Sequence, residues 1–143
     1  MDKERIKNYN CPVDAAMDIL GGKYKAIIVY KLINKTLRYN EIQKLIPKAT
    51  PRMLSKQLRE LEQDNIISRK VYPVVPPKTE YSLTEWGKTL IPVVIALADW
   101  GKLLYHQAGV DLPCKTQSWQ RQIPRKDMPF KHISSRGIKK SVL

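Results

Sequence analysis

One segment, residues 50–65 (TPRMLSKQLRELEQDN), restricts the fold most because it specifies a single helix with two different faces. At about 100° per residue, one narrow sector of this helix is apolar and consists of Leu54, Leu58 and Leu61. Roughly opposite lie Arg52, Lys56, Arg59 and Gln63. We expect the leucines to pack on a core and the cations to face outward. A solvated charged surface is the alternative reading of the same pattern.

The ends of this helix carry local signals. Thr50 is a suitable N-cap, and Pro51 suits the first helical position because its missing N–H is not needed there. Asn65 tolerates the left-handed conformation just past a helix end. These residues predict where the helix begins and ends.

The segment before it, residues 39–46, predicts a short helix that Pro47 ends. Its apolar side is expected to contain Tyr39, Ile42, Leu45 and Ile46. The short connection to Pro51 makes the pair a helix-turn-helix pattern. Two further helices upstream should complete the core. One begins near Pro12, and the other follows Gly21 and Gly22 with a stripe of Tyr24, Ile27, Ile28 and Leu32.

Residues 66–72 and 79–83 are rich in β-branched and aromatic residues and predict a hairpin. The connecting sequence PVVPPK contains three prolines, which lack the N–H that a sheet needs and stiffen the loop. A helix-turn-helix followed by a projecting hairpin is a winged helix. Arg69, Lys70 and Lys78 place positive charge on or near this wing.

A long helix is expected from Thr84, with Pro92 kinking or dividing it. Its apolar residues follow one another at coiled-coil spacing: Trp86, Leu90, Val93, Leu97, Trp100 and Leu104. A second stripe beside it makes the helix more apolar than one small core requires. We therefore expect a homodimer through this face, although both stripes packing within one protomer is the alternative.

The charge balance favours a polyanionic partner, since 26 Lys and Arg oppose 13 Asp and Glu and give a formal net charge of +13. No apolar run approaches the roughly 20 residues needed to span a bilayer, and the first residues lack the apolar core of a secretory signal, so we expect a cytoplasmic protein without membrane contact. Residues 1–105 should form one domain. Residues 106–143, with 8 basic and 2 acidic side chains, are expected to be a mobile basic extension, or simply a solubilising tail.

Five sequence segments resemble, in order, the HxlR-type helix-turn-helix regulators: CPVDAAMDILGGKYK, RYNEIQKLIP, PRMLSKQLRELEQD, VYPVVPPKTEYSLTEWG and ADWG. The resemblance covers residues 11–104. It implies a mainly α winged helix with a small β-hairpin, related to the MarR group, in a bacterial transcription regulator that dimerises through its terminal helices. The family's recognition helix falls on residues 50–64 and its wing tip on residues 73–78. Tyr24 stands where the family usually has tryptophan, and Asn65 where it has glycine.

The predicted DNA contacts lie on the helix of residues 50–65 and on the wing: Thr50, Arg52, Ser55, Lys56, Arg59, Lys70 and Lys78. An arginine fork pairs bidentately with guanine, whereas lysine more often contacts phosphate. We therefore expect Arg52 or Arg59 to read bases in the major groove. A two-fold dimer predicts an inverted-repeat operator.

The two cysteines, Cys11 and Cys114, lack the paired spacing of a zinc site, and the two histidines add no ligand cluster. Cys11 precedes Pro12 at the start of a helix, where the positive end of the dipole favours thiolate, with Arg5, Lys7 and Lys23 nearby in sequence. Some members of the family that the chain resembles sense oxidants, quinones or aldehydes at such a cysteine. An inert cysteine is the alternative. Cys114 is either its resolving partner in the other subunit or a plain tail residue.

Three classes of function compete. An enzyme is the poorest, because no nucleophile with a base, no phosphate-binding loop and no metal constellation is present in the sequence, and no cofactor is predicted. A charge-driven nucleic-acid or nucleoid binder without an operator is the main alternative to a sequence-specific regulator. A small-molecule or electrophile effector is compatible with the regulator, but no residue defines it.

Overall fold

The computed structural model describes residues 3–113. Within these residues the chain divides after Val94 into two compact units. The described elements follow in the order α1 (Lys3–Lys7), α2 (Pro12–Leu20), α3 (Lys25–Lys31), β1 (Leu37–Arg38), α4 (Tyr39–Leu45), α5 (Pro51–Gln63), β2 (Ile67–Tyr72), β3 (Lys78–Leu83), α6 (Glu85–Lys88) and α7 (Ile91–Ala108). The predicted mainly α fold with a small β-hairpin is confirmed.

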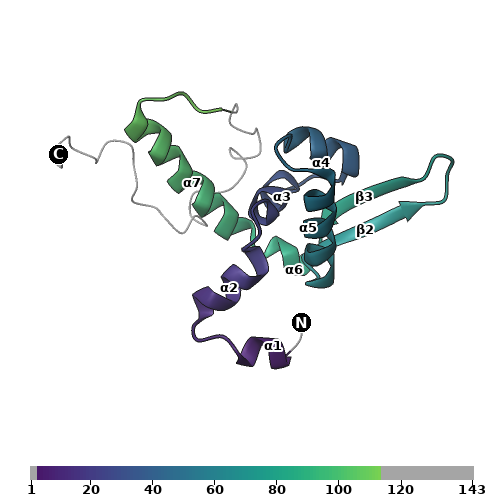
Figure 1. Ribbon diagram of the computed structural model, residues 1–143, viewed down its shortest axis with the longest axis horizontal. Coiled ribbons are helices and arrows are strands. Elements are labelled where there is room, and N and C mark those ends of the chain that lie inside the picture. Colours follow the sequence, from purple (N-terminus) through teal and green to yellow (C-terminus); the bar gives the residue numbers. More distant parts are fainter. Residues whose placement is uncertain (1–2, 114–143) are drawn as a thin grey trace. The chain divides into compact units, whose positions relative to one another are not determined.

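Helices α3, α4 and α5 pack around the core of the first unit, and α5 also packs against β2 (Figure 1). The side chains that fill this core are almost completely buried: Ile28, Leu32, Ile33, Ile42, Leu54, Leu58, Leu61, Ile66 and Ile67. The leucine face of α5 is therefore docked as predicted. Two residues expected on apolar stripes, Ile27 and Leu45, are instead 40% and 45% exposed.

The sheet has three antiparallel strands in the order β1-β3-β2. Strands β2 and β3 form the predicted hairpin, which projects from the helices in Figure 1. The two-residue strand β1 was not predicted. It lies immediately before α4 and pairs Leu37 with Tyr81 and Arg38 with Glu80, so that the helix-turn-helix is joined to the wing through its edge.

The predicted ends of α5 are confirmed. The hydroxyl of Thr50 accepts a hydrogen bond from the backbone N–H of Met53 at 3.2 Å, and Pro51 is the first helical residue. Asn65 has a φ of 56°, in the left-handed region that asparagine tolerates better than most residues. The chain can therefore turn directly from α5 into β2.

The expected long helix from Thr84 is divided. Thr84 caps α6 by accepting a hydrogen bond from the Gly87 N–H at 2.8 Å, and a new helix, α7, begins at Ile91. Pro92 lies in the first turn of α7, where proline is tolerated, so the division precedes it. Trp86 and Leu90 consequently do not share one continuous helix with the rest of the predicted seam.

Gly87 permits the close approach of α6 to the end of α5. A Cβ atom at this position would lie 1.9 Å from the carbonyl oxygen of Ile66. The hydroxyl of Thr84 also donates to the Asn65 carbonyl at 2.6 Å. The turn after α5 is therefore held against the start of α6.

Candidate nucleic-acid interface

The outer face of α5 presents the predicted contact residues to solvent. All of the side chains proposed there are exposed: Thr50, Arg52, Ser55, Lys56 and Arg59. The opposite side of α5 is buried in the core, where Leu54, Leu58 and Leu61 are at most 2% exposed. The separation into two faces that the sequence predicts is thus present in the structure.

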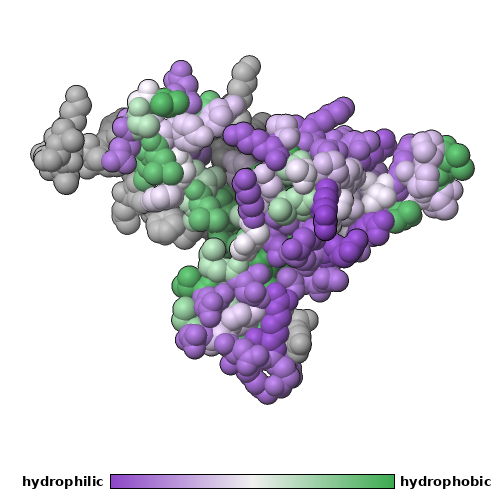
Figure 2. Space-filling view, in the orientation of Figure 1, coloured by the Kyte–Doolittle hydropathy of each residue, from purple (hydrophilic) through white to green (hydrophobic). Residues whose placement is uncertain are grey.

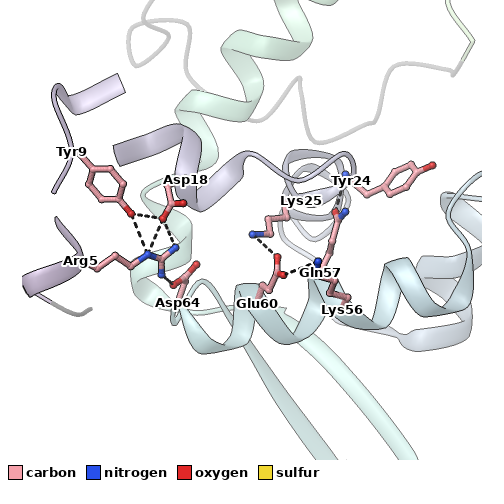
Figure 3. A network of polar contacts seen from close by, with 9 residues as sticks. All are labelled: Arg5, Tyr9, Asp18, Tyr24, Lys25, Lys56, Gln57, Glu60 and Asp64. Atoms are coloured by element: carbon pink, nitrogen blue, oxygen red, sulfur yellow. Dashed lines mark hydrogen bonds and ion pairs between the residues drawn. The ribbon is translucent and has the colours of Figure 1, made fainter. Parts of the chain in front are cut away.

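Two polar residues of α5 point inward beside the leucines, and the sequence reasoning missed both. The side-chain oxygen of Gln57, which is buried, accepts a hydrogen bond from the backbone N–H of Tyr24 at 2.8 Å. The carboxylate of Glu60 pairs with the buried ammonium of Lys25 at 2.7 Å (Figure 3). Both contacts reach the start of α3, so they fix the rotation of α5 about its own axis.

Glu60 also faces the outer cations. One of its carboxylate oxygens lies 3.8 Å from the ammonium of Lys56, one turn earlier on the same helix. The hydrogen bond from Lys25, followed by the charge of Lys25 and that of Lys56, lowers the pKa of Glu60 below its ordinary value. Glu60 therefore stays ionised at neutral pH and joins a buried cation to an exposed one.

Helix α4 supports the beginning of α5 through one tyrosine. The hydroxyl of Tyr39 donates to the carbonyl of Pro51 at 3.2 Å and accepts a hydrogen bond from the hydroxyl of Ser55 at 3.4 Å. Tyr24 adds a second brace by donating from its hydroxyl to the carbonyl of Lys48, in the turn between the helices, at 3.0 Å. Ser55 is thus exposed, and its hydroxyl is hydrogen-bonded to Tyr39.

Lys70 and Lys78 share one face of the wing. In the register of the hairpin Lys70 opposes Glu80 and Tyr72 opposes Lys78, and these positions alternate with the buried Tyr81. The ammonium of Lys70 lies 4.9 Å from the centre of the Tyr72 ring, whose hydroxyl donates to Glu80 at 3.0 Å.

Burial raises the pKa of Tyr81, on the other face of the hairpin. Arg69 also lies on that other face, in register with Tyr81. Val74 and Val75 are exposed in the loop between β2 and β3, and Figure 2 shows an apolar patch at the tip of this hairpin.

A second polar cluster lies at the C-terminal end of α5 and was not predicted. Arg5 of α1 pairs with Asp64, which caps α5, at 2.6 Å and also pairs with Asp18 of α2. These two carboxylates, Asp18 first, raise the pKa of Arg5. The Tyr9 hydroxyl, followed by Arg5, lowers the pKa of Asp18, and Asp18 in turn raises the pKa of Tyr9. No sequence pattern marked these residues, because they are up to 59 positions apart.

Cys11 is the N-cap of α2, and its side chain is exposed. Its sulfur accepts a hydrogen bond from the backbone N–H of Asp14 at 3.4 Å. The cations expected near it make contacts elsewhere. Arg5 pairs with carboxylates, Lys7 pairs with Glu4 at 2.6 Å, and the ammonium of Lys23 lies 5.4 Å from the centre of the Tyr24 ring. Cys114 and most of the predicted basic extension lie outside the described residues.

Within residues 3–113 no group of three or more His, Cys, Asp or Glu side chains is arranged to hold a metal ion. In the same part of the chain no helix is long and apolar enough to cross a bilayer. Both statements concern only these residues.

The predicted dimer-forming side chains are mostly exposed. Trp86, Val93, Leu97, Trp100 and Leu104 are each at least 43% exposed, whereas Leu90 is partly buried. Three of them, Leu97, Trp100 and Leu104, belong to the second unit and follow one face of α7 at spacings of three and four residues. Large apolar side chains left in water on one helix face commonly mark a protein interface.

A family model described as HxlR-like helix-turn-helix matches residues 19–108. The chain belongs to the HxlR-like helix-turn-helix family. Among curated relatives, the uncharacterized HTH-type transcriptional regulator YdeP of Bacillus subtilis is 58% identical over 92 residues, which are 64% of this chain and 72% of the relative. The resemblance inferred from the five sequence segments is confirmed.

Solved structures of two similar regulators share the fold. The redox regulator HypR in its oxidized form is 51% identical with a TM-score of 0.62, covering 64% of this chain and 95% of that chain. The diamide-treated YodB from Bacillus subtilis is 35% identical with a TM-score of 0.55, covering 65% of this chain and 93% of that chain. This HxlR-type chain is accordingly a winged-helix transcriptional regulator.

Proposed function

We propose that this HxlR-type regulator binds an inverted-repeat operator as a homodimer, with α5 in the major groove and the wing beside it. The exposed cationic face of α5 carries the proposal, because its rotation is fixed from behind by Gln57 and Glu60. A helix held in one orientation presents its side chains to base edges reproducibly, which sequence discrimination requires.

The residues have separate roles in this proposal. Arg52 and Arg59 read base edges, since an arginine fork pairs bidentately with guanine. Lys56, Lys70 and Lys78 contact phosphates and position the protein. Thr50 and Ser55 lie beside these cations and add hydroxyl contacts at the start of the helix.

The homodimer is proposed to form through α7. The exposed Leu97, Trp100 and Leu104 would be covered by the same face of a second copy. A two-fold dimer places two recognition helices about 34 Å apart, which matches successive major grooves on one side of B-DNA. An isologous interface also explains why the operator is expected to be an inverted repeat.

Selection of binding sites from random DNA, followed by affinity measurement at fixed salt, tests the proposal. The wild-type protein should enrich an inverted repeat. Arg52→Ala or Arg59→Ala should each reduce the ratio of the affinity for the selected duplex to that for random duplex about 5- to 150-fold, from about 1 to 3 kcal/mol per arginine. Lys35→Ala, which removes an equal charge from an exposed turn, is the matched control and should preserve the ratio. Unchanged ratios for both arginine variants would refute the assignment.

A charge-driven binder without an operator is the second candidate, favoured by the net charge of +13. It predicts similar affinity for every duplex and a steep decline of affinity with salt. The same selection separates the two functions, because a charge-driven binder enriches no sequence.

We also propose that Cys11 responds to oxidants. HypR is described as a redox regulator and YodB was solved after diamide treatment, and both are similar to this chain. Cys11 is exposed, so an oxidant reaches it. Diamide takes two hydrogens from two thiols and leaves a disulfide, for which Cys114 of the second subunit is the candidate partner.

Mass spectrometry after mild diamide treatment is the test, with operator affinity measured in parallel. Cys11→Ser is the informative variant because serine preserves the helix cap while removing the thiol. The wild-type protein should form a Cys11 crosslink and change its affinity, whereas the variant should do neither. Absence of any Cys11 adduct in the wild-type protein would exclude oxidant sensing at this residue.

A further inference from the structure

A single guanidinium holds together three helices of the first unit. The Nη1 of Arg5, on α1, donates to the Oδ1 of Asp64 at 2.6 Å, and its Nε donates to the Oδ2 of Asp18, on α2, at 2.8 Å. Its Nη2 also donates to Asp18 (Figure 3). One side chain near the N-terminus therefore contacts the residue that ends α5.

The position of Asp64 explains why a cation is needed there. Asp64 is the C-cap of α5 and is only 8% exposed. The C-terminal end of a helix carries partial negative charge, so a buried carboxylate at this end is unfavourable unless a cation compensates it. Arg5 supplies that positive charge, and the contact ties the end of α5 to α1.

The connection between α1 and α2, residues 8–11, is bridged by the same cluster. The Tyr9 hydroxyl donates to Asp18 and accepts a hydrogen bond from the Nε of Arg5 at 3.1 Å. Cys11 is the last residue of this connection and caps α2. A change at Cys11 that displaces the connection therefore acts on the two side chains, Arg5 and Tyr9, that lead to Asp64.

We propose that Arg5 is a positioning residue for α5 and that it links the connection carrying Cys11 to the C-terminal end of that helix. The inference rests on the proposed function of α5 as the helix that contacts DNA. It assigns a route by which the N-terminal segment influences the outer face of α5. The link lies within one unit of the molecule. From Cys11 the backbone leads over two residues to Tyr9, and hydrogen bonds lead on from Tyr9 to Arg5 and from Arg5 to Asp64.

The chain offers a matched pair of variants. Arg5→Gln and Lys7→Gln each remove one positive charge from α1, but Lys7 pairs with Glu4 inside that helix and makes no bond to α5 or α2 among the contacts described. Both changes should weaken nonspecific DNA binding equally, because this binding depends on overall charge. Carrying them on a Cys114→Ser background leaves Cys11 as the single thiol in the chain.

N-ethylmaleimide is a suitable probe because it alkylates an exposed thiol without requiring an oxidant or a second cysteine. Hydrogen exchange of the backbone amides of residues 60–66 reports on the end of α5. In the unlabelled protein, Arg5→Gln should accelerate this exchange about 5- to 10-fold, whereas Lys7→Gln should not. Labelling Cys11 should accelerate the exchange in the parent, which is the Cys114→Ser protein, and in Lys7→Gln. In Arg5→Gln labelling should cause no further acceleration.

The ratio of the affinity for the selected duplex to that for random duplex should follow the same pattern. It should fall about 5- to 10-fold in Arg5→Gln and remain unchanged in Lys7→Gln. Arg5→Lys keeps the charge without the planar fork and should give intermediate values. If Arg5→Gln fails to fold, Arg5→Lys and Asp64→Asn carry the same comparison.

Equal exchange in Arg5→Gln and Lys7→Gln would overturn the positioning role, and an undiminished labelling effect in Arg5→Gln would overturn the link. The absence of a labelling effect in the parent would also overturn the link. Failure of the proposed function gives a different result. In that case no sequence is enriched, or diamide has no effect, while the exchange comparison still decides the role of Arg5.

Discussion

The ion pair between Lys25 and Glu60 should respond asymmetrically to removal of its two partners. The Lys25 side chain is 7% exposed, whereas that of Glu60 is 34% exposed and also has Lys56 nearby. Glu60→Gln leaves a buried ammonium without its carboxylate. Lys25→Met removes the buried charge, fills a similar volume, and leaves a carboxylate that water and Lys56 can reach.

The expected free energies of unfolding follow from this difference in exposure. Breaking a fully buried pair from one side costs about 3 to 5 kcal/mol, and the partial exposure of Glu60 reduces this to about 2 kcal/mol for Glu60→Gln. Lys25→Met should cost at most about 1 kcal/mol, since the remaining charge is solvated. The double variant should be more stable than Glu60→Gln, because it contains no unpaired buried charge.

Urea denaturation of the four proteins, monitored by circular dichroism, measures these differences. With equal slopes, a loss of about 2 kcal/mol lowers the midpoint by about 1 M when the slope is about 2 kcal/mol/M. Lys56→Met controls for loss of an exposed lysine and should change the midpoint little. The reasoning is refuted if Lys25→Met is as destabilising as Glu60→Gln, or if the double variant gains nothing over Glu60→Gln.

Two further predictions concern pH and packing. Because the pKa values of Asp18 and Glu60 are lowered in the folded state from their ordinary values of 3.8 and 4.5, their contributions to stability are present at neutral pH and are lost as pH falls below these values. Between pH 7 and pH 3, the Tm of Glu60→Gln should fall less steeply than the Tm of the wild type. Parallel curves of Tm against pH would contradict this. Gly87→Ala should cost about 3 kcal/mol, because the new Cβ would meet the Ile66 carbonyl oxygen at 1.9 Å. Urea denaturation measures this cost, and a loss below about 1 kcal/mol would contradict the steric argument.

The features predicted correctly from sequence are those that local chemistry determines. Thr50, Pro51 and Asn65 act within one helical turn of the residues they influence, and the leucine stripe of α5 repeats at the helical period. The wing was recognisable because two β-rich runs flank a proline-rich connection. These signals sufficed for the fold and for the exposed cations of α5.

The features missed depend on partners distant in sequence. Strand β1 contains two residues and exists because β3 pairs with it some forty positions later. Lys25 and Gln57 look like surface residues in the sequence, yet each is buried because its polar atom meets a partner on another helix. The division between α6 and α7 was placed at Pro92, but α6 already ends at Lys88 and α7 begins at Ile91. In α6, Gly87 packs against the carbonyl oxygen of Ile66, which is 21 positions earlier.

The polar contacts of α5 lie on both flanks of its leucine stripe, and this arrangement explains how a small domain can hold the outer face of α5 in one orientation. At about 100° per residue, Gln57 and Glu60 fall on one flank and Ser55 on the other. The first flank is bonded to the start of α3, and the second to Tyr39 of α4. Leucines alone would tolerate some rotation, because apolar contact is not directional. Hydrogen bonds on opposite flanks resist rotation in both senses, so the direction of Arg52 and Arg59 is set by residues that themselves face away from the proposed DNA.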